Sequence, residues 1–420
     1  MYERTVLDNG LPVLTCTMPQ TRSVTLAVFV GAGSRYETDA MAGLSHFLEH
    51  LPFKGTRDWP TAMHISEAIE GVGGMMNAST DREMTVYWVK VARDHFPRAV
   101  SVLSDMILYP TLDPVEVEKE REVILEELRA SNDQPGFRAD LLIDEALWPD
   151  QAMGRDVGGS IDSVRALQRE EIHEYMCRQY VPGNAVIATA GELTHEDVLD
   201  HIVPAFGGWQ PGEAGSWLPL EERNGQPNVR LEHRRTDQAY ICVGLPGVPL
   251  DHPDRYAMNL LNAILGGGMS SRLFQELREK ESLAYDVHSS ANFFRDTGCM
   301  VVSCGTEPPK GQRAVTAIME QLDHMRDRVG EDELERNREM FKGRLLLRME
   351  DTRSVAMWLG GQELLQGQVR SVDQVVDKLC QVTSDDVQRL ANELISQERL
   401  NLSVVGPYRS ERPFQKLLKL

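Results

Sequence analysis

The second half of this 420-residue chain repeats the order of apolar and polar segments of the first half. Ser45 aligns with Asn259 and Arg121 with Arg338, at offsets of 214 and 217 residues. A near-constant offset over matching segments indicates two related domains, and each half has about 200 residues, a common domain size. We therefore expect an α+β chain of two homologous domains, which accounts for the repeat better than one large domain does.

The predicted elements follow the same order in both halves. Alternating or β-branched apolar runs predict strands, and apolar residues at helical spacing predict helices. Asp113 and Pro114 suit the N-cap and first turn of the longest helix in the first half. The predicted strands are 23–33, 83–91 and 238–247, and the predicted helices are 40–51, 61–72, 96–108, 113–132, 256–268, 312–325 and 331–349.

The domain boundary is placed in a stretch without periodicity. Residues 207–228 are rich in Gly, Pro and charge, as linkers are. We predict an N-terminal domain over 1–212, a linker over 213–226 and a C-terminal domain over 227–420.

Charge and cysteine content narrow the class of protein. The formal net charge is −20, which excludes nucleic acid as a partner on electrostatic grounds. An acidic protein can attract basic peptides, or its charge can simply keep it in solution. Six scattered cysteines without a CxxC pair suit a reducing compartment. No apolar run approaches the roughly 18 residues of a membrane span, so we expect a cytoplasmic protein without a membrane segment; an organelle protein that has lost its transit peptide would have the same composition.

The stretch GLSHFLEHLPFKGT, residues 43–56, contains candidate metal-binding residues. His46 and His50 are four residues apart, so their imidazoles lie on one helix face and can converge on one metal ion, with Glu49 beside them. An ordinary amphipathic helix can carry the same residues. The repeat favours a metal site, because the aligned helix at 256–268 has only apolar residues at these three positions. The fold itself therefore does not need the polar groups.

A catalytic zinc needs about three protein ligands and an open position for water, so one ligand is missing. The helix over 113–132 offers several glutamates. Glu120 and Glu127 are seven residues apart and share a face with Val123 and Ile124, which we expect to be the buried side. Carboxylates on a buried face need a metal or a cation as partner, whereas Glu126, about 100° away, is expected to meet solvent.

These segments together resemble the pitrilysin–insulinase superfamily of metallopeptidases, of M16 type. HFLEH is the inverted HxxEH zinc motif, and the resemblance extends to GGMMNASTDREMTVY, EREVILEEL and GGGMSSRLFQELREKESLAY. It covers essentially the whole chain and is strongest for the short-chain branch of mitochondrial processing peptidase and bacterial processing-protease-like proteins. The glycines of GGGMSS do not form a phosphate-binding loop, because no GxxxxGK[ST] pattern is present.

The resemblance implies roles for five residues. His46, His50 and Glu127 match the ligands of one zinc ion per chain, and Glu49 matches the general base. Glu120 matches a glutamate that orients a ligand imidazole. Pro52 departs from the family pattern, and since proline has no N–H, we expect the helix to end or kink just after His50.

Two further pairs match substrate-binding positions of the family. Asn77 and Ala78 fall on an edge strand that pairs with the substrate backbone; without the family they suit an ordinary turn into a strand. Arg278 and Tyr285 match a pair that holds the substrate and the developing oxyanion; without the family they belong to a charged helix end.

The resemblance also implies an assembly. Each domain would be a mostly antiparallel β-sheet flanked by helices, and the two would form one bowl-like half of a closed peptidase chamber. We expect a homodimer in which each site is completed by the other chain, although a heterodimer with an inactive homologue remains open. The substrates would be unfolded peptides, and the acidic balance suggests basic ones. The alternative is a non-catalytic or partner-dependent subunit of a processing-peptidase-like complex.

Overall fold

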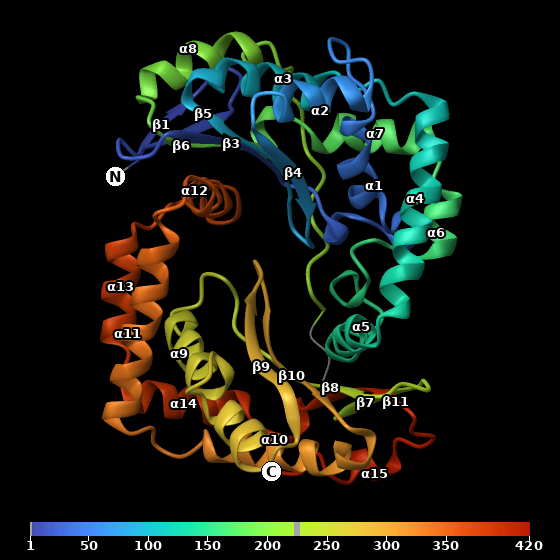
Figure 1. Cartoon of the computed structure of the whole chain (residues 1–420), viewed down its shortest axis with the longest axis vertical. Coiled ribbons are helices and arrows are strands. Elements are labelled where there is room, and N and C mark those ends of the chain that lie inside the picture. Colours follow the sequence, from blue (N-terminus) through green and yellow to red (C-terminus); the bar gives the residue numbers. More distant parts are fainter. Residues whose placement is uncertain (1, 222–226) are drawn as a thin grey trace. The chain divides into compact units, whose positions relative to one another are not determined.

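The computed structural model describes residues 2–221 and 227–420, and it divides into two compact units (Figure 1). Unit 1 comprises Met1–Leu128, Asp156–Leu218 and Leu346–Ser371, and unit 2 comprises Arg129–Arg155, Pro219–Leu345 and Val372–Leu420. Each unit thus contains a segment from the other half of the sequence. The domain boundaries given above remain a prediction about the sequence repeat, and residues 222–226 of the predicted linker lie outside the described residues.

Unit 1 is built on a six-stranded sheet in the order β1-β2-β6-β3-β5-β4. Neighbouring strands are antiparallel except for β2 and β6, which are parallel. The strands are β1 Glu3–Val6, β2 Pro12–Thr17, β3 Ser23–Val30, β4 Met75–Thr80, β5 Thr85–Ala92 and β6 Ala185–Gly191.

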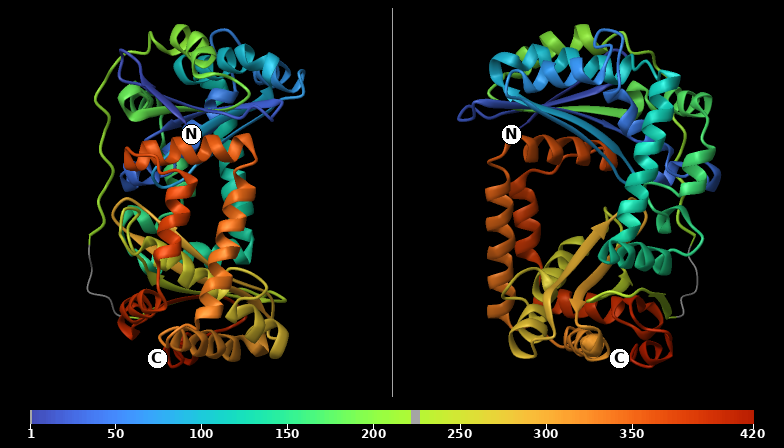
Figure 2. Two further views of the ribbon diagram at one scale, coloured as in Figure 1. Left: turned by 90° about the vertical axis from the view of Figure 1, so that its left-hand side faces the viewer. Right: turned by 45° about the vertical axis from the view of Figure 1, so that its right-hand side comes forward.

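Helices cover both faces of this sheet. Figures 1 and 2 show α12 along one face and α3 and α8 along the other. The helices of unit 1 are α1 Leu44–His50, α2 Ala62–Glu70, α3 Phe96–Leu108, α4 Pro114–Asp133 up to Leu128, α6 Ile161–Ala166, α7 Arg169–Gln179, α8 His195–Phe206 and α12 Thr352–Gln366.

The two-residue period of the strands divides the unit 1 core into two layers. In β3, Leu26 and Val28 belong to the larger core, which α1 and α3 help to build. Ala27 and Phe29 point to the opposite face and pack with α12. Because both faces are buried, β3 is an almost continuous apolar run with little polar alternation.

Unit 2 is built on a five-stranded sheet in the order β7-β11-β8-β10-β9, antiparallel except for the β7–β11 pair. Its strands are β7 Asn228–His233, β8 Ala239–Pro246, β9 Ala284–Phe293, β10 Gly298–Thr306 and β11 Asn401–Gly406. Its helices are α5 Pro135–Leu147, α9 Arg255–Gly266, a π-helical stretch Phe274–Lys280, α10 Gly311–His324, α11 Glu331–Arg348 up to Leu345, α13 Val372–Gln381, α14 Ser384–Leu394 and α15 Arg412–Gln415.

The helices α5 and α12 each pack on the sheet of the other sequence half, at positions where glycine allows close approach. A Cβ on Gly360 of α12 would lie 2.0 Å from the Phe29 ring in β3. A Cβ on Gly244 of β8 would lie 2.7 Å from Ile143 of α5. These contacts explain why the compact units are discontinuous in sequence.

The structure confirms the predicted α+β class with two mostly antiparallel sheets flanked by helices. Predicted elements such as 96–108 and 331–349 coincide with α3 and α11 to within one residue. Asp113 also caps α4, because its side chain accepts hydrogen bonds from the backbone N–H groups of Val115 and Glu116.

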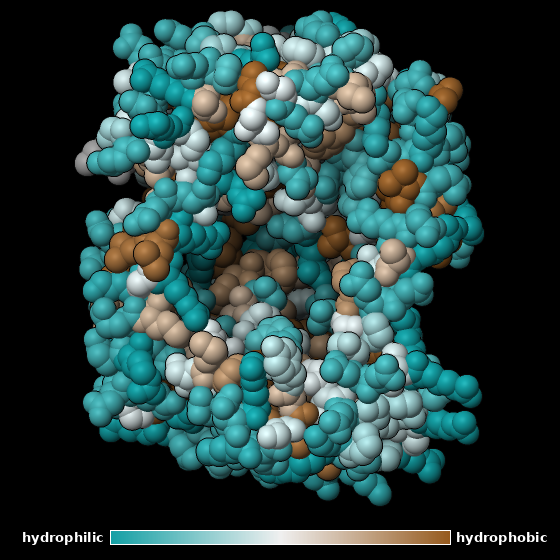
Figure 3. All heavy atoms as spheres, in the orientation of Figure 1, coloured by the Kyte–Doolittle hydropathy of each residue, from teal (hydrophilic) through white to brown (hydrophobic). Residues whose placement is uncertain are grey.

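The surface shown in Figure 3 is predominantly hydrophilic, with hydrophobic side chains in separate patches. None of the helices among the described residues is long and apolar enough to cross a membrane.

Candidate metal centre

The helix that carries the motif is short, and its start is held by a buried carboxylate. Gly43 precedes α1 with φ 91°, a left-handed conformation that favours glycine. Glu37 is fully buried and accepts hydrogen bonds from the N–H groups of Gly43 and Ser45, at 2.8 and 2.6 Å. A negative charge there stabilises the N-terminus of α1. Glu37 was not predicted from the sequence.

The three predicted zinc ligands converge in the structure. The Nε2 atoms of His46 and His50 lie 3.2 Å apart, and Glu127 oxygens lie 3.7 and 3.8 Å from them. One donor atom from each residue lies within 4.8 Å of the others. Zn–N bonds of about 2.0–2.1 Å at a tetrahedral angle separate two nitrogens by about 3.3 Å. The His₂Glu set therefore fits a zinc ion.

Glu120 fixes the orientation of the second imidazole. Its carboxylate accepts a 2.8 Å hydrogen bond from His50 Nδ1, which leaves Nε2 of that ring free to bind a metal. The other oxygen lies 2.5 Å from Nζ of Lys54. Burial acts to raise the pKa of Glu120, but the hydrogen bonds from His50 and Lys54 outweigh it and lower the pKa. Glu120 thus stays ionised although it is only 3% exposed.

Burial keeps the other histidine in the form that binds metals. Desolvation lowers the pKa of His46, and the neighbouring charge of His50 lowers it further. Its Nδ1 atom is buried and has no hydrogen-bond partner among the described residues. A neutral imidazole with Nε2 in the cluster is the state that a zinc site requires.

The expected burial of the α4 face is wrong in part. Glu120 and Ile124 are buried, but Val123 is 50% exposed and the Glu127 side chain is 49% exposed. Residues seven apart drift by about 20° around a straight helix. The buried face follows Ile124 and Leu128, and Glu127 lies at its edge.

Pro52 ends the motif helix as predicted. The helix α1 stops at His50 and a single 3₁₀ turn follows at Leu51–Phe53. The proline has no N–H for the carbonyl of Leu48, and the buried hydroxyl of Tyr87 donates to that carbonyl instead, at 3.1 Å. The sequence analysis did not identify this tyrosine.

A second buried tyrosine completes this arrangement. The hydroxyl oxygens of Tyr87 and Tyr180 are 3.0 Å apart. Because Tyr87 donates its proton to a carbonyl, Tyr180 must donate to Tyr87. Burial raises the pKa of Tyr180, and the nearby charge of Glu49 acts in the same direction. Both hydroxyls therefore stay protonated beside the half-buried Glu49.

Asn77 and Ala78 lie on β4, the last strand in the order of the unit 1 sheet. Ala78 pairs with Tyr87 of β5 in the strand register, and α1 packs against β4. The expected edge strand is therefore present next to the motif helix.

Arg278 and Tyr285 come together within unit 2. The guanidinium carbon of Arg278 lies 4.5 Å from the Tyr285 ring centroid and 4.7 Å from that of Phe274. Tyr285 is 77% exposed at the start of β9, so its hydroxyl is accessible to a ligand.

Comparisons with known proteins identify the family of the chain. The profile of the insulinase family, peptidase family M16, matches residues 12–160, and that of the peptidase M16 inactive domain matches residues 166–341. An uncharacterized zinc protease of Streptomyces coelicolor is 38% identical and covers 97% of this chain and 90% of its own length. A second, from Bacillus subtilis, is 33% identical and covers 97% and 98%.

Solved structures support the same conclusion about the fold. A protease from Helicobacter pylori superposes with a TM-score of 0.91 at 22% identity, covering 97% of this chain and 99% of that one. A peptidase M16 inactive domain from Pseudomonas fluorescens superposes with a TM-score of 0.89 at 18% identity and the same coverage. The fold is that of an M16-type peptidase. By its sequence relatives, the chain belongs to peptidase family M16.

Proposed function

We propose that this protein is a zinc-dependent endopeptidase that cleaves unfolded peptides. The observation that carries the proposal is the convergence of His46, His50 and Glu127 donor atoms at 3.2, 3.7 and 3.8 Å. Relatives named zinc proteases support the same activity.

The side chains around the cluster would share the chemistry. A zinc ion held by His46, His50 and Glu127 would lower the pKa of a water molecule and polarise the scissile carbonyl. Glu49 would accept the proton of the attacking water and then deliver it to the leaving amine. Glu120 would hold the His50 ring in the orientation that binding requires.

Substrate binding would use backbone and side-chain donors. An extended peptide would add to the edge strand β4 near Asn77 and Ala78, through main-chain hydrogen bonds that demand little of the sequence. Arg278 and Tyr285 would donate hydrogen bonds to the carbonyl oxygen as negative charge develops on it. Basic peptides and a cytoplasmic location remain predictions from the sequence.

The test combines metal analysis with digestion of mixed unfolded peptides, read by mass spectrometry. The wild type should contain one zinc per chain and cleave, whereas Glu49→Gln should keep the zinc and lose cleavage. Glu127→Gln should lose both, and Glu122→Gln, an exposed change on the same helix, should lose neither. Cleavage that survives in Glu49→Gln would refute the assignment of the base.

We further propose a homodimer in which the metal centre of one chain is completed by Arg278 and Tyr285 of the other. Mixing Glu49→Gln chains with Tyr285→Phe chains should then leave one of two sites intact in each mixed dimer. Activity should rise above that of either variant alone. If mixing restores nothing, the sites are not shared, and a heterodimer with an inactive homologue becomes the next arrangement to test.

A non-catalytic subunit remains the alternative, because the second-half profile is described as an inactive domain. That segment is the half without the candidate ligands. A zinc-loaded wild type that cleaves no peptide, alone or mixed with variants, would favour this alternative.

A further inference from the structure

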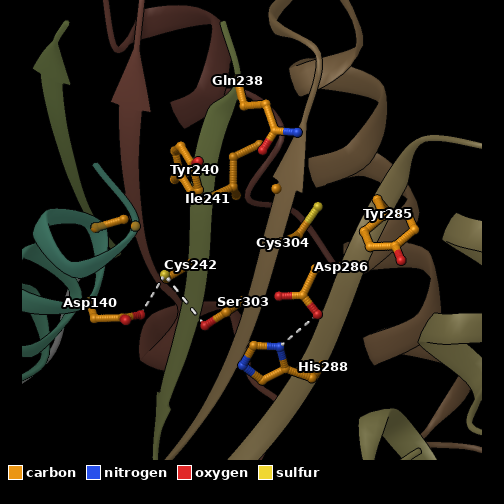
Figure 4. A pocket seen from close by; sticks show the side chains of 13 residues that line it. Asp140, Gln238, Tyr240, Ile241, Cys242, Tyr285, Asp286, His288, Ser303 and Cys304 are labelled. Atoms are coloured by element: carbon orange, nitrogen blue, oxygen red, sulfur yellow. Dashed lines mark hydrogen bonds and ion pairs between the residues drawn. The ribbon is translucent and has the colours of Figure 1, made fainter. Parts of the chain in front are cut away.

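One of the two candidate histidine ligands lacks the support that the other has. Glu120 accepts a hydrogen bond from Nδ1 of His50 at 2.8 Å, whereas Nδ1 of His46 is buried and has no hydrogen-bond partner among the described residues. Buried polar groups normally have a partner; the buried thiol of Cys242, for example, donates to Asp140 at 3.3 Å (Figure 4). The unpaired nitrogen of His46 therefore needs an explanation.

A metal-bound imidazole needs an acceptor at its second nitrogen. A neutral ring carries one proton, and when Nε2 binds a metal ion this proton is on Nδ1, which becomes a donor. The His46 ring directs Nε2 into the cluster, 3.2 Å from Nε2 of His50. Nδ1 of His46 is thus the donor atom, and because a buried donor without an acceptor is costly, an acceptor beside it would strengthen metal binding.

The loop over residues 156–159 lies against the start of the motif helix. A Cβ on Gly43 would lie 2.4 Å from the carbonyl oxygen of Gly158, and a Cβ on Gly159 would lie 2.3 Å from the carbonyl oxygen of Ala42. Gly43 and Gly159 have φ angles of 91° and 78°, in the region that favours glycine. Both segments therefore come together through backbone atoms, which places this loop directly beside α1.

Gly158 leaves an opening between His46 and a carboxylate of this loop. A Cβ on Gly158 would lie 3.6 Å from Nδ1 of His46 and 3.5 Å from Oδ1 of Asp156. Both atoms border the same point, at which this chain has no side chain. The N–H of Gly158 donates to Oδ1 of Asp156 at 2.9 Å and so orients the carboxylate. A carboxylate can accept several hydrogen bonds at once, including one from an imidazole.

The electrostatic surroundings of His46 also include Asp156. Burial lowers the pKa of His46, and the charge of His50 lowers it further. The carboxylates of Glu127, Glu49 and Asp156 act in the opposite direction. Glu127 is a candidate ligand and Glu49 is the candidate base. Asp156 is therefore close enough to interact with the ring, and neither metal binding nor proton transfer has been assigned to it.

We propose that Asp156 is a positioning residue for His46, and that its carboxylate accepts the Nδ1–H hydrogen bond of this ring when Nε2 binds the metal ion. The proposal rests on the proposed zinc-dependent function and deepens it. Asp156 would orient His46 as Glu120 orients His50, without contacting the substrate. Gly158 belongs to the arrangement, because a side chain at this position would stand between the two groups.

Zinc affinity, measured by competition with a metal indicator, tests the proposal without cleavage. Asp156→Ala should weaken zinc binding about 10-fold, as the loss of a group that orients a metal ligand does. Asp156→Asn keeps an acceptor oxygen and should recover most of this loss. Asp200→Ala, an exposed change on α8, should leave the affinity unchanged.

Gly158→Ala covers the case in which Asp156→Ala disturbs folding, because it leaves the carboxylate in place. The added methyl group would lie between His46 and Asp156 and should weaken zinc binding by a similar factor. Gly183→Ala, with open space around the new Cβ, is the matched control and should have no effect.

The proton on Nδ1 provides a readout that a purely structural role would not change. In zinc-loaded protein labelled with ¹⁵N-histidine, the Nδ1–H signal of His46 should be protected from exchange with solvent, and this protection should fall in Asp156→Ala. Wild-type zinc affinity and unchanged protection in Asp156→Ala and Gly158→Ala would overturn the proposal. A loss of affinity that Asp156→Asn shares in full, with unchanged protection, would also overturn it. A protein that shows the expected zinc and exchange results but cleaves no peptide would refute only the proposed peptidase function.

Discussion

Replacing Tyr87 with phenylalanine should loosen the end of the motif helix, and restoring an N–H at position 52 should repair it. The substitution removes the hydroxyl that donates to the Leu48 carbonyl and accepts from Tyr180. Tyr87 is 0% exposed, so water cannot replace the lost partner. An unsatisfied buried polar group costs about 1–3 kcal/mol, and we expect a loss of unfolding free energy of that size for Tyr87→Phe.

The repair follows from the backbone around Pro52. His50, Leu51 and Lys54 all have right-handed helical φ and ψ, so an N–H at position 52 would point to the Leu48 carbonyl. In a Pro52→Ala background, Tyr87→Phe should therefore cost about 1 kcal/mol less than in the wild type. The unfolding free energies of the wild type, the two single variants and the double variant would be measured by urea unfolding. Hydrogen exchange of the α1 amides and zinc retention would report on the motif helix itself.

Tyr180→Phe provides the control, because it leaves the bond from Tyr87 to Leu48 in place. Its cost should not depend on the residue at position 52. Equal costs of Tyr87→Phe in the Pro52 and Pro52→Ala backgrounds would refute the idea that the tyrosine compensates for the proline.

Three further changes test other parts of the structure. Lys54→Met should weaken zinc binding about 10-fold through Glu120, whereas Lys54→Arg should retain it, as read by competition with a metal indicator. Gly360→Ala should destabilise unit 1 by about 1–3 kcal/mol, because the added methyl group would collide with the Phe29 ring. The adjacent Gly361→Ala has open space around it and should instead stabilise α12 by about 1 kcal/mol. Equal shifts of the melting temperature in the two variants would contradict the close contact at Gly360. Glu232 accepts hydrogen bonds from Arg138 and Arg234, which outweigh burial and lower its pKa. The ionised Glu232 therefore stabilises the folded state fully above the ordinary glutamate pKa of about 4.3, and this stabilisation is lost as the pH falls through the lowered pKa of the folded state. Glu232→Gln should be less stable than the wild type at pH 7 but not in strong acid.

The sequence was sufficient to predict the common face of the two histidines and the end of α1, because the interactions that set them are local. The spacing of His46 and His50 sets their common face, and Pro52 acts on the carbonyl four residues before it. The aligned helix of the second half has apolar residues at these positions, which indicated that the fold itself does not require the two histidines. The same local reasoning found Glu120 and Glu127 but overestimated the burial of Glu127, because a face seven residues long drifts around the helix.

Partners from distant segments were not predictable in the same way. Lys54 stands in the motif region, yet nothing in the spacing shows that it reaches Glu120. Tyr87 and Tyr180 are 93 positions apart, and each has the ordinary pattern of a buried aromatic residue. The missing hydrogen bond at Pro52 was the one available signal, since it implied that the Leu48 carbonyl needs another donor.

The exchange of α5 and α12 shows the limit of the repeat as a guide to folding units. An amphipathic helix pattern indicates that a face is buried but not which sheet buries it. Phe29 and Trp88 project from the face of the unit 1 sheet that α12 covers, more than 250 residues away in sequence. Each such aromatic side chain would lose about 1.5–3 kcal/mol of burial without that helix. The first half of the repeat therefore carries all three candidate zinc ligands, but its sheet acquires a second packed face only when the distant segment Leu346–Ser371 folds onto it.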